Sequence, residues 1–283
     1  AMAALLGVAA DRIALVDSTC TGLSIVLQGL PWRAGDHVLL GDAEYPAVEM
    51  AVRRLEPRFG VTHTVVPAAL DAARFRSRLE AAWTPRTRLV VVSHVLWTTG
   101  EVVAVDSLAQ LCRARGAHLL VDGAQSIGAL PPVTLNEAVS FYAFPAHKHL
   151  CGPAGVGALY VAPFAEPELE PVFAGWRGVL PDGRQRAGAF MRGARRYEQG
   201  TTTFATRPAL LAALAVHDGF ASAEVRARHA LAAAARLRER LAATAGVELL
   251  LPEAPASTLV GFRVAGCEPD AAVVALAAAG VHV

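Results

Sequence analysis

The chain has 283 residues and carries 26 lysines and arginines against 25 aspartates and glutamates, for a formal net charge of +1. This length suffices for one large α/β domain followed by a smaller one, with a sizeable buried core. The even charge balance excludes a general basic face for nucleic acid or an anionic membrane, and the apolar runs fall short of the ~18 residues of a membrane span. We therefore expect a small neutral or zwitterionic partner, and no nucleic acid or membrane.

The cysteine pattern and the first residues of the chain indicate the cellular compartment of the protein, and the last residues bear on the extent of its C-terminal domain. Its four cysteines form no CxxC pair, which fits a reducing cytosol better than a disulfide framework or a zinc site. The opening AMAALLGVAA lacks a basic segment before its apolar run and predicts a helix end rather than a signal peptide. The last residues, AGVHV, suggest a helix-to-strand passage, so we expect the domain to continue past Val283. The sequence predicts a cytoplasmic protein.

Short β-branched runs alternate with helical patterns over the first half of the chain. The runs VVVSHV and HLLVD are almost continuously apolar, which is typical of strands covered on both faces of a parallel sheet. The alternation predicts a doubly wound α/β domain with a largely parallel seven-stranded sheet and helices on both faces. Strands are expected at residues 12–17, 37–42, 63–67, 88–95, 118–122, 139–144 and 156–161. Helices are expected at residues 22–30, 46–57, 71–82, 106–115 and 124–129.

The second half of the chain has a different character. Residues 163–200 are rich in Gly, Pro and Arg, and loops this long are usually functional. Two alanine-rich helices are expected at residues 208–220 and 222–245, before two short strands and a helix that begin a small α+β domain. The second helix carries an expected solvated face of arginines at positions 226, 228, 236, 238 and 240. We predict a large domain at 1–220 and the start of a small one at 221–283.

Polar residues follow three of the predicted strands, at the edge where open α/β sheets bind ligands. Asp122 ends the strand HLLVD, and Gln125 follows three residues later. His147 and Lys148 follow VSFYAF, and the segment STCTG opens a helix after RIALVD. Pyridoxal phosphate (PLP) requires an amine, a carboxylate opposite its ring nitrogen, an anion site for its phosphate and a planar group over its ring.

Each of these groups has a role at such a cofactor. Lys148 can supply the amine for a Schiff base, and Asp122 can hold the pyridine nitrogen protonated. The STCTG segment offers hydroxyls and free backbone N–H groups at a helix start, where the macrodipole favours a phosphate. Tyr45, in GDAEYP, is a candidate ring stacker.

Taken singly, these residues have ordinary structural alternatives. Asp122 is a typical strand-end cap, Lys148 a typical surface lysine and STCTG a helix N-cap sequence. His147 and His149 are typical of a loop and lack the third ligand of a metal site. GPAGVG predicts a tight turn rather than a dinucleotide-binding loop. The order of the segments along the chain is what favours the cofactor site.

Four segments, VVVSHVLWTTGEV, HLLVDGAQSIGA, FYAFPAHKHLCGPAGVGALYV and YEQGTT, resemble the class V aminotransferase family of fold-type I PLP enzymes. That family includes cysteine desulfurases, isopenicillin N epimerase and C–S lyases. The resemblance runs from about residue 5 to the chain end. It implies that Lys148 is the Schiff-base lysine, that Asp122 pairs with the pyridine nitrogen and that Gln125 bonds the phenolic oxygen.

The same resemblance implies how the phosphate is held and how the protein assembles. Thr19, Cys20 and His147 match phosphate-site positions of the family. Thr201 would reach the phosphate of the neighbouring subunit, because the family's active sites form across a dimer interface. The resemblance thus implies a homodimer with shared active sites that acts on a small amino-acid substrate.

The sequence departs from the desulfurase pattern at several positions. Pro145 stands where desulfurases carry a phosphate-binding serine, and Cys20 where a second threonine is common. Trp97 occupies the place of an asparagine close to the cofactor, and Tyr45 replaces the stacking histidine. One extra residue separates Lys148 from the next glycine, as in the epimerase-like branch. These changes argue for a specialised amino-acid enzyme of a biosynthetic pathway.

Several reactions stay open. Our first expectation is a lyase that cleaves the Cβ–S bond of a cysteine conjugate. Epimerisation, transamination, decarboxylation and cysteine desulfuration are alternatives, since fold does not fix function; a PLP or other α/β binding protein without catalysis is the alternative from another class. The family's substrate-carboxylate arginine and any persulfide-forming cysteine would lie beyond Val283, so we interpret Cys151 and Cys267 as structural. Residues 177–196 either contact an anionic substrate arm or form a solvated dimer-edge loop.

Overall fold

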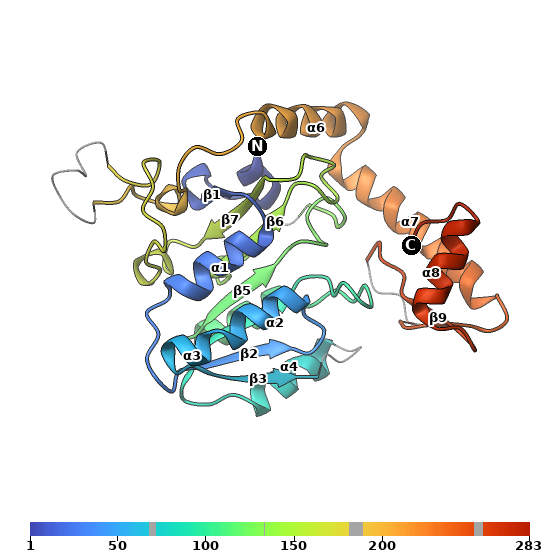
Figure 1. Cartoon of the computed structure of the whole chain (residues 1–283), viewed down its shortest axis with the longest axis horizontal. Helices are drawn as coiled ribbons and strands as arrows, with labels where there is room; N and C mark the ends of the chain where they lie inside the picture. Colours follow the sequence, from blue (N-terminus) through green and yellow to red (C-terminus); the bar gives the residue numbers. More distant parts are fainter. Residues whose placement is uncertain (68–71, 133, 181–188, 252–256) are drawn as a thin grey trace.

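The computed structural model describes residues 1–67, 72–132, 134–180, 189–251 and 257–283. A seven-stranded sheet in the spatial order β1-β7-β6-β5-β4-β2-β3 forms its centre (Figure 1). Strand β7 runs antiparallel to β1 and β6, and the other pairs of neighbouring strands are parallel. The strands are β1 (Ile13–Val16), β2 (His37–Gly41), β3 (Thr62–Val66), β4 (Thr87–Ser93), β5 (His118–Asp122), β6 (Phe141–Pro145) and β7 (Gly157–Val161). The predicted largely parallel sheet and its seven strands are confirmed.

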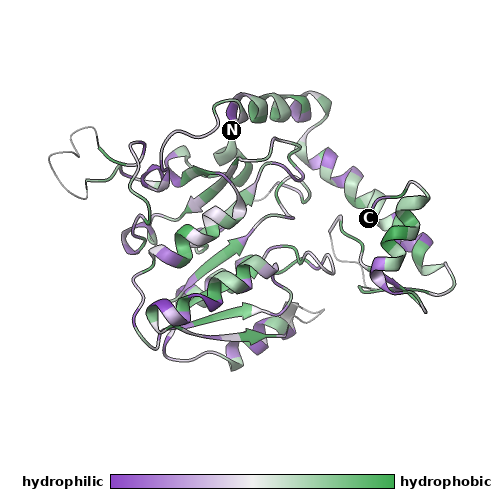
Figure 2. Ribbon diagram, viewed as in Figure 1, coloured by the Kyte–Doolittle hydropathy of each residue, from purple (hydrophilic) through white to green (hydrophobic). Residues whose placement is uncertain are grey.

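Helices pack against this sheet, with α1 and α2 in front of it in the view of Figure 1. Strands β5, β6 and β7 are buried at every position, so both faces of the sheet are covered, as expected. The strands are mostly hydrophobic in Figure 2. The helices are α1 (Thr19–Gly29), α2 (Pro46–Arg53), α3 (Leu55–Phe59), α4 (Ala72–Ala81), α5 (Val105–Ala114), α6 (Thr206–Phe220), α7 (Ala223–Ala242) and α8 (Pro269–Ala278), with 3-10 turns at Met2–Leu6, Ala10–Arg12, Glu166–Glu168 and Ala194–Tyr197.

Two helix predictions differ from the structure. The stretch 46–57 divides into α2 and α3, because Pro57 has no N–H to donate to the carbonyl of Arg53, where α2 ends. The predicted helix at 124–129 is wrong, since these residues form consecutive turns. Gly128 takes a φ of 90° there, a left-handed conformation that is incompatible with an α-helix.

Helix α1 is brought close to the centre of the sheet by its sequence. Ser18 caps the helix, because its hydroxyl accepts a hydrogen bond from the N–H of Thr21 at 3.1 Å. One turn on, a Cβ added to Gly22 would come within 2.9 Å of the Cβ of Ala143 in β6. Glycine therefore allows a close approach that places the start of α1 beside the carboxyl ends of the central strands.

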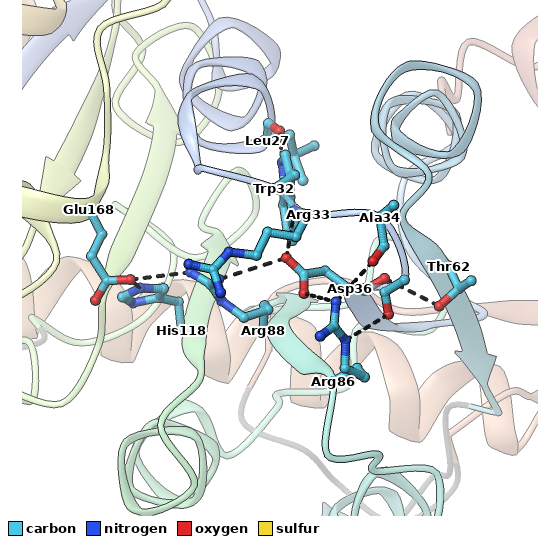
Figure 3. A network of polar contacts seen from close by, with 11 residues as sticks. Leu27, Trp32, Arg33, Ala34, Asp36, Thr62, Arg86, Arg88, His118 and Glu168 are labelled. Atoms are coloured by element: carbon cyan, nitrogen blue, oxygen red, sulfur yellow. Dashed lines mark hydrogen bonds and ion pairs between the residues drawn. The ribbon is translucent and has the colours of Figure 1, made fainter.

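A chain of ion pairs joins the amino ends of β2, β4 and β5 (Figure 3). The buried Asp36 carboxylate lies 3.1 Å from Nη2 of Arg86 and 3.7 Å from Nη1 of Arg88. An oxygen of Glu168 lies 3.3 Å from both Nη2 of Arg88 and Nε2 of His118. These contacts tie together the starts of three parallel strands, whose carboxyl ends therefore emerge side by side at the opposite edge.

The C-terminal elements lie apart from the large sheet (Figure 1). Helix α7 leads to β8 (Val247–Leu249) and β9 (Phe262–Val264), which pair antiparallel, and α8 follows. The domain boundary after residue 220 stays a prediction; it coincides with the end of α6. The expected solvated face of arginines on α7 is wrong at one position. Arg238 is buried and donates a hydrogen bond to the carbonyl of Leu259 at 3.0 Å.

The described residues contain neither a membrane-spanning helix nor a cluster of metal-ligating side chains. No helix among them is long and apolar enough to cross a membrane. Over the same ranges, no three or more His, Cys, Asp and Glu side chains gather as they would to hold a metal ion. Part of the predicted contact loop at 177–196, residues 181–188, lies outside the described residues.

Candidate active site

Residues at the carboxyl ends of β1, β4, β5 and β6 line one cavity of about 150 Å³. This is the edge of the sheet at which the sequence predicts a ligand. Eight of the nine predicted site residues belong to the lining, namely Thr19, Cys20, Tyr45, Trp97, Asp122, Gln125, His147 and Lys148. Ser18, Ser93, Val95, Ala124 and Pro145 complete it.

Neighbouring parallel strands bring Asp122 and Lys148 to this cavity. Asp122 ends β5 and pairs in register with Ala143 of β6, and Lys148 follows the end of β6. The Asp122 carboxylate is 6% exposed and accepts a hydrogen bond from the N–H of Ala124 at 2.8 Å. Burial raises the pKa of Asp122, while this N–H and the charge of Lys148 act in the opposite direction. A cationic group in the cavity stabilises a buried carboxylate that faces it. A protonated ring nitrogen would be such a cationic group.

Lys148 is the only lysine among the 283 residues, since every other basic residue of the Lys+Arg set is an arginine. This is a signal in the sequence that composition alone could have revealed. Arginine cannot form a Schiff base at ordinary pH, because its guanidinium stays protonated. The single primary amine of the side chains therefore lies in the predicted cavity.

The first turn of α1 forms one wall of the cavity. Ser18, Thr19 and Cys20 present two hydroxyls and a thiol beside backbone N–H groups at the positive end of the helix dipole. Burial, followed by the negative charge of Asp122, raises the pKa of the Cys20 thiol, which keeps it neutral. Pro145 also lines the cavity and has no backbone N–H to donate.

Two aromatic side chains stand at the rim. Tyr45 and Trp97 are 47% and 43% exposed, and their rings meet edge to face with centroids 5.8 Å apart. The indole Nε1 of Trp97 donates to the carbonyl of Glu44 at 3.3 Å. The two rings thus form an apolar rim on an otherwise polar site.

Glu44 and Ser93 were missed by the sequence analysis. The Glu44 carboxyl is buried and bonds the N–H and the hydroxyl of Ser93 at 3.0 and 2.6 Å. Burial raises its pKa to about 8, although the two bonds from Ser93 lower it. Glu44 therefore holds the start of the rim segment to the end of β4 through an uncharged pair at neutral pH.

Gln125 has a partner that sequence analysis assigned to an ordinary loop. Its Oε1 lies 2.9 Å from Nε2 of His149, and His149 is half buried beside Lys148. The signal in the sequence was the unusual triplet HKH, in which lysine is flanked by two histidines.

Thr201 is the one predicted site residue that lies outside this cavity. It lines a second cavity of about 530 Å³ together with Asp17, Thr21, Trp176 and Gln199. Within one copy of the chain the two cavities have separate linings. Its predicted role at a neighbouring subunit therefore stays a prediction.

Comparison with known proteins decides the family. The sequence model of the family described as aminotransferase class-V matches residues 1–283. The chain belongs to the aminotransferase class-V family. The resemblance inferred from the four sequence segments is thereby confirmed.

Curated relatives in the class-V family carry different names. Isopenicillin N epimerase of Streptomyces clavuligerus is 35% identical over 185 residues, which cover 64% of this chain and 46% of the relative. A probable cysteine desulfurase of Mycolicibacterium paratuberculosis is 30% identical over 282 residues, 96% of this chain and 40% of the relative. The chain thus spans less than half the length of these two curated relatives.

Solved structures confirm the class-V fold. The complex of the cystine C–S lyase C-DES with its reaction product, cysteine persulfide, matches with a TM-score of 0.92 and 34% identity, and covers 99% of this chain and 75% of C-DES. A lysine-to-alanine mutant of C-DES with glycine covalently linked to the PLP cofactor has the same TM-score and identity and covers 74% of C-DES. The predicted fold class is confirmed by these matches.

Proposed function

We propose that the chain binds PLP in the cavity at the carboxyl ends of β5 and β6, and that the protein cleaves the Cβ–S bond of a cysteine conjugate by β-elimination. One observation carries the proposal: the single lysine, Lys148, and the buried carboxylate of Asp122 line the same cavity beside the start of α1. The donor set fits the cofactor, with an amine, a carboxylate, a helix N-terminus and aromatic rings in one place.

Each predicted site residue in the cavity would have its own task. Lys148 would hold the cofactor through Nζ, and Asp122 would keep the ring nitrogen protonated. Thr19, Cys20 and His147 would surround the phosphate, Tyr45 and Trp97 would lie near the ring, and Gln125 would donate to the phenolic oxygen. When bound, PLP supplies a conjugated ring that accepts the electron pair left at Cα of an attached amino acid.

The β-elimination would require removal of the Cα proton and cleavage of the Cβ–S bond. In its neutral form, the Lys148 amine would be the base that takes the Cα proton. The Cβ–S bond then breaks, and its electron pair leaves with the sulfur as a thiolate. Water hydrolyses the remaining three-carbon fragment, so the overall products are a thiol, pyruvate and ammonia, with no oxidant or reductant.

Two observations favour this reaction over the family's other chemistries. C-DES, a cystine C–S lyase, matches 99% of this chain at 34% identity. The rim of Tyr45 and Trp97 is apolar, and aromatic rings make favourable contacts with thioether sulfur. Epimerisation and transamination use the same Lys148 and Asp122 and are the outcomes against which the lyase must be tested.

We also propose that two copies assemble into a homodimer in which Thr201 approaches the phosphate site of the neighbouring copy. Large apolar side chains on and before α6 support it, because Phe204, Leu211, Val216 and Phe220 are all at least 58% exposed. Such a surface is typical of an interface. Light scattering should therefore give twice the monomer mass, and Thr201→Ala should weaken PLP binding.

The cofactor site is tested first. Purified protein incubated with PLP should become yellow, and borohydride should fix one cofactor to the peptide that carries Lys148. Since the chain has no other lysine, mass spectrometry locates the label without ambiguity. Lys148→Ala should lose the label and Lys148→Arg should lose it as well, because arginine keeps the charge but cannot form the linkage.

The reaction is tested with the loaded enzyme and a panel of S-substituted cysteines and cystine. Pyruvate, ammonia and thiol or persulfide in equal amounts are expected. Racemised substrate without pyruvate would indicate an epimerase instead of a lyase, and accumulation of pyridoxamine phosphate would indicate a transaminase. Absence of bound PLP would contradict both the cofactor site and the proposed reaction.

A further inference from the structure

His149 contacts the amide side chain that faces the proposed cofactor. Gln125 lines the cavity, and its Oε1 accepts a hydrogen bond from Nε2 of His149 at 2.9 Å. We propose that His149 is a positioning residue that fixes the orientation of the Gln125 amide, so that the NH2 end of the amide is directed to the phenolic oxygen of PLP. The inference rests on the proposed function, because it concerns the same cofactor site.

The hydrogen-bond inventory determines which end of the amide is free. An amide oxygen only accepts, so the bond requires the hydrogen of the imidazole to be on Nε2. With Oε1 occupied by His149, both amide hydrogens of Gln125 remain for other partners. A phenolate oxygen accepts hydrogen bonds and is repelled by a carbonyl oxygen, so this orientation suits the cofactor and the reversed one opposes it.

The charge state of His149 agrees with this role. Burial, followed by the charge of Lys148, lowers its pKa, so the ring is neutral at ordinary pH and carries one N–H. Lys148 is the charged group that acts on the ring, and residues 123–129 of the facing turn contain no ionisable side chain. With the hydrogen on Nε2, as the bond to Oε1 requires, this single N–H is donated to Gln125.

Backbone packing fixes the distance between the two residues. A Cβ added to Gly128 would come within 2.8 Å of the carbonyl oxygen of His149, so the turn that carries Gln125 rests directly on the backbone of His149. That turn is held at its start by the bond from the N–H of Ala124 to Asp122. On the other side, the N–H of Cys151 donates to the carbonyl of Lys148 at 2.9 Å. Both partners therefore belong to backbone segments that are anchored independently of their side chains.

The test uses the PLP-loaded protein without substrate and follows the pH titration of its lysine-linked chromophore. A donor to the phenolic oxygen stabilises the unprotonated form of the chromophore and lowers the pH midpoint. His149→Leu leaves the amide free to turn, and the midpoint should rise by about 1 pH unit. His149→Gln keeps an N–H near the position of Nε2 and should restore the midpoint to within ~0.3 units of wild type.

A double-mutant cycle separates positioning from general damage to the site. Gln125→Leu should raise the midpoint as well, and the added His149→Leu change should then have no further effect. His229→Leu, an exposed histidine of α7, is the matched control and should titrate like the wild type. Equal midpoints for wild type and His149→Leu, or additive shifts in the double variant, would overturn the inference while leaving the cofactor site in place.

A measurement on the wild-type holoenzyme covers the case in which His149→Leu does not fold. Nitrogen-15 NMR of the histidine side chains should place the His149 hydrogen on Nε2 at neutral pH, and a hydrogen on Nδ1 would overturn the inference. The two levels of failure are distinct. A wild type that forms no chromophore contradicts the proposed function and the inference with it, whereas a normal chromophore with an Nδ1 hydrogen contradicts the inference alone.

Discussion

The hydroxyl of Tyr142 lies 2.7 Å from Nδ1 of His94, in the core of the sheet. The same hydroxyl lies 2.6 Å from Oγ of Ser126, in the turn that carries Gln125. The backbone N–H of His94 also donates to the carbonyl of Asp122 at 2.8 Å. A buried polar network thus connects Tyr142 of β6 to the residues that follow the ends of β4 and β5.

Tyr142→Phe should lower the free energy of unfolding, although it removes only one oxygen atom. His94 and Ser126 would each lose a partner in a site that water does not reach, and the free energy of unfolding should fall by about 1–3 kcal/mol. Urea denaturation measures the change. Tyr160→Phe is the matched control on the neighbouring strand, because Tyr160 is buried and its hydroxyl has no hydrogen bond among the described residues. Equal losses for the two variants would contradict a role for the network.

Glu44 should make the stability of the protein depend on pH. Burial raises its pKa from 4.5 to about 8, so between these values the folded state holds a proton that the unfolded state has lost. Stability due to this group is complete below about pH 4.5 and decreases as pH rises to about 8. The total decrease is on the order of a few kcal/mol.

Glu44→Gln removes this titration and keeps the shape of the protonated carboxyl. The variant should lose the decrease in unfolding free energy between about pH 5 and 8, and above that range it should be the more stable protein. Urea denaturation over a pH series measures both. Glu49→Gln, on the exposed face of α2, serves as the control, and a Glu44→Gln profile parallel to the wild type would show that Glu44 is ionised in the folded state.

The sheet and the centre of the site could be predicted because they depend on local pattern. The run HLLVD is short, apolar and ended by a carboxylate, and the next strand along the chain ends just before His147 and Lys148. Parallel strands bring such ends to one edge whatever their exact order. The sequence could therefore place Asp122 and Lys148 at one cavity before the pairing between the strands was known.

Contacts between distant segments could not be predicted in this way. Glu44 reaches Ser93, 49 residues away, only because β2 and β4 are neighbours in the sheet. The failure at 124–129 has a local origin instead, since the carboxylate of Asp122 accepts a hydrogen bond from the N–H of Ala124 and Gly128 takes a left-handed conformation. Apolar spacing indicated a helix there, but side-chain hydrogen bonds and a left-handed glycine determined the backbone.

Trp97 should control which sulfur substituent the enzyme accepts. Trp97→Asn removes half of the aromatic rim formed with Tyr45 and introduces the residue of the desulfurase pattern. The KM for cysteine conjugates with apolar S-substituents should rise about tenfold, because an apolar pocket contact contributes 1–3 kcal/mol. Steady-state kinetics with S-benzyl- and S-methylcysteine compares large and small groups. Tyr45→Phe keeps the rim and should change the KM little; an unchanged ratio of the two substrates in Trp97→Asn would exclude the rim from specificity.

Cys20 is the position at which the phosphate site can be improved. It lies in the first turn of α1 and lines the cavity, but its thiol is neutral and a weak donor. Cys20→Thr adds a hydroxyl that can donate to a phosphate oxygen, and a hydrogen bond of ordinary strength should tighten PLP binding by about fivefold. Fluorescence titration of the cofactor-free protein measures the dissociation constant.

The comparison with Cys20→Ala decides whether the hydroxyl is the cause. Alanine removes the thiol without adding a donor, so its PLP affinity should equal that of the wild type or fall below it, and Cys267→Thr, in the C-terminal elements, should have no effect. Tighter binding by Cys20→Ala would mean that the sulfur obstructs the phosphate. Equal PLP affinities for the wild type, Cys20→Thr and Cys20→Ala would mean that the backbone N–H groups of α1 hold the phosphate without help from this side chain.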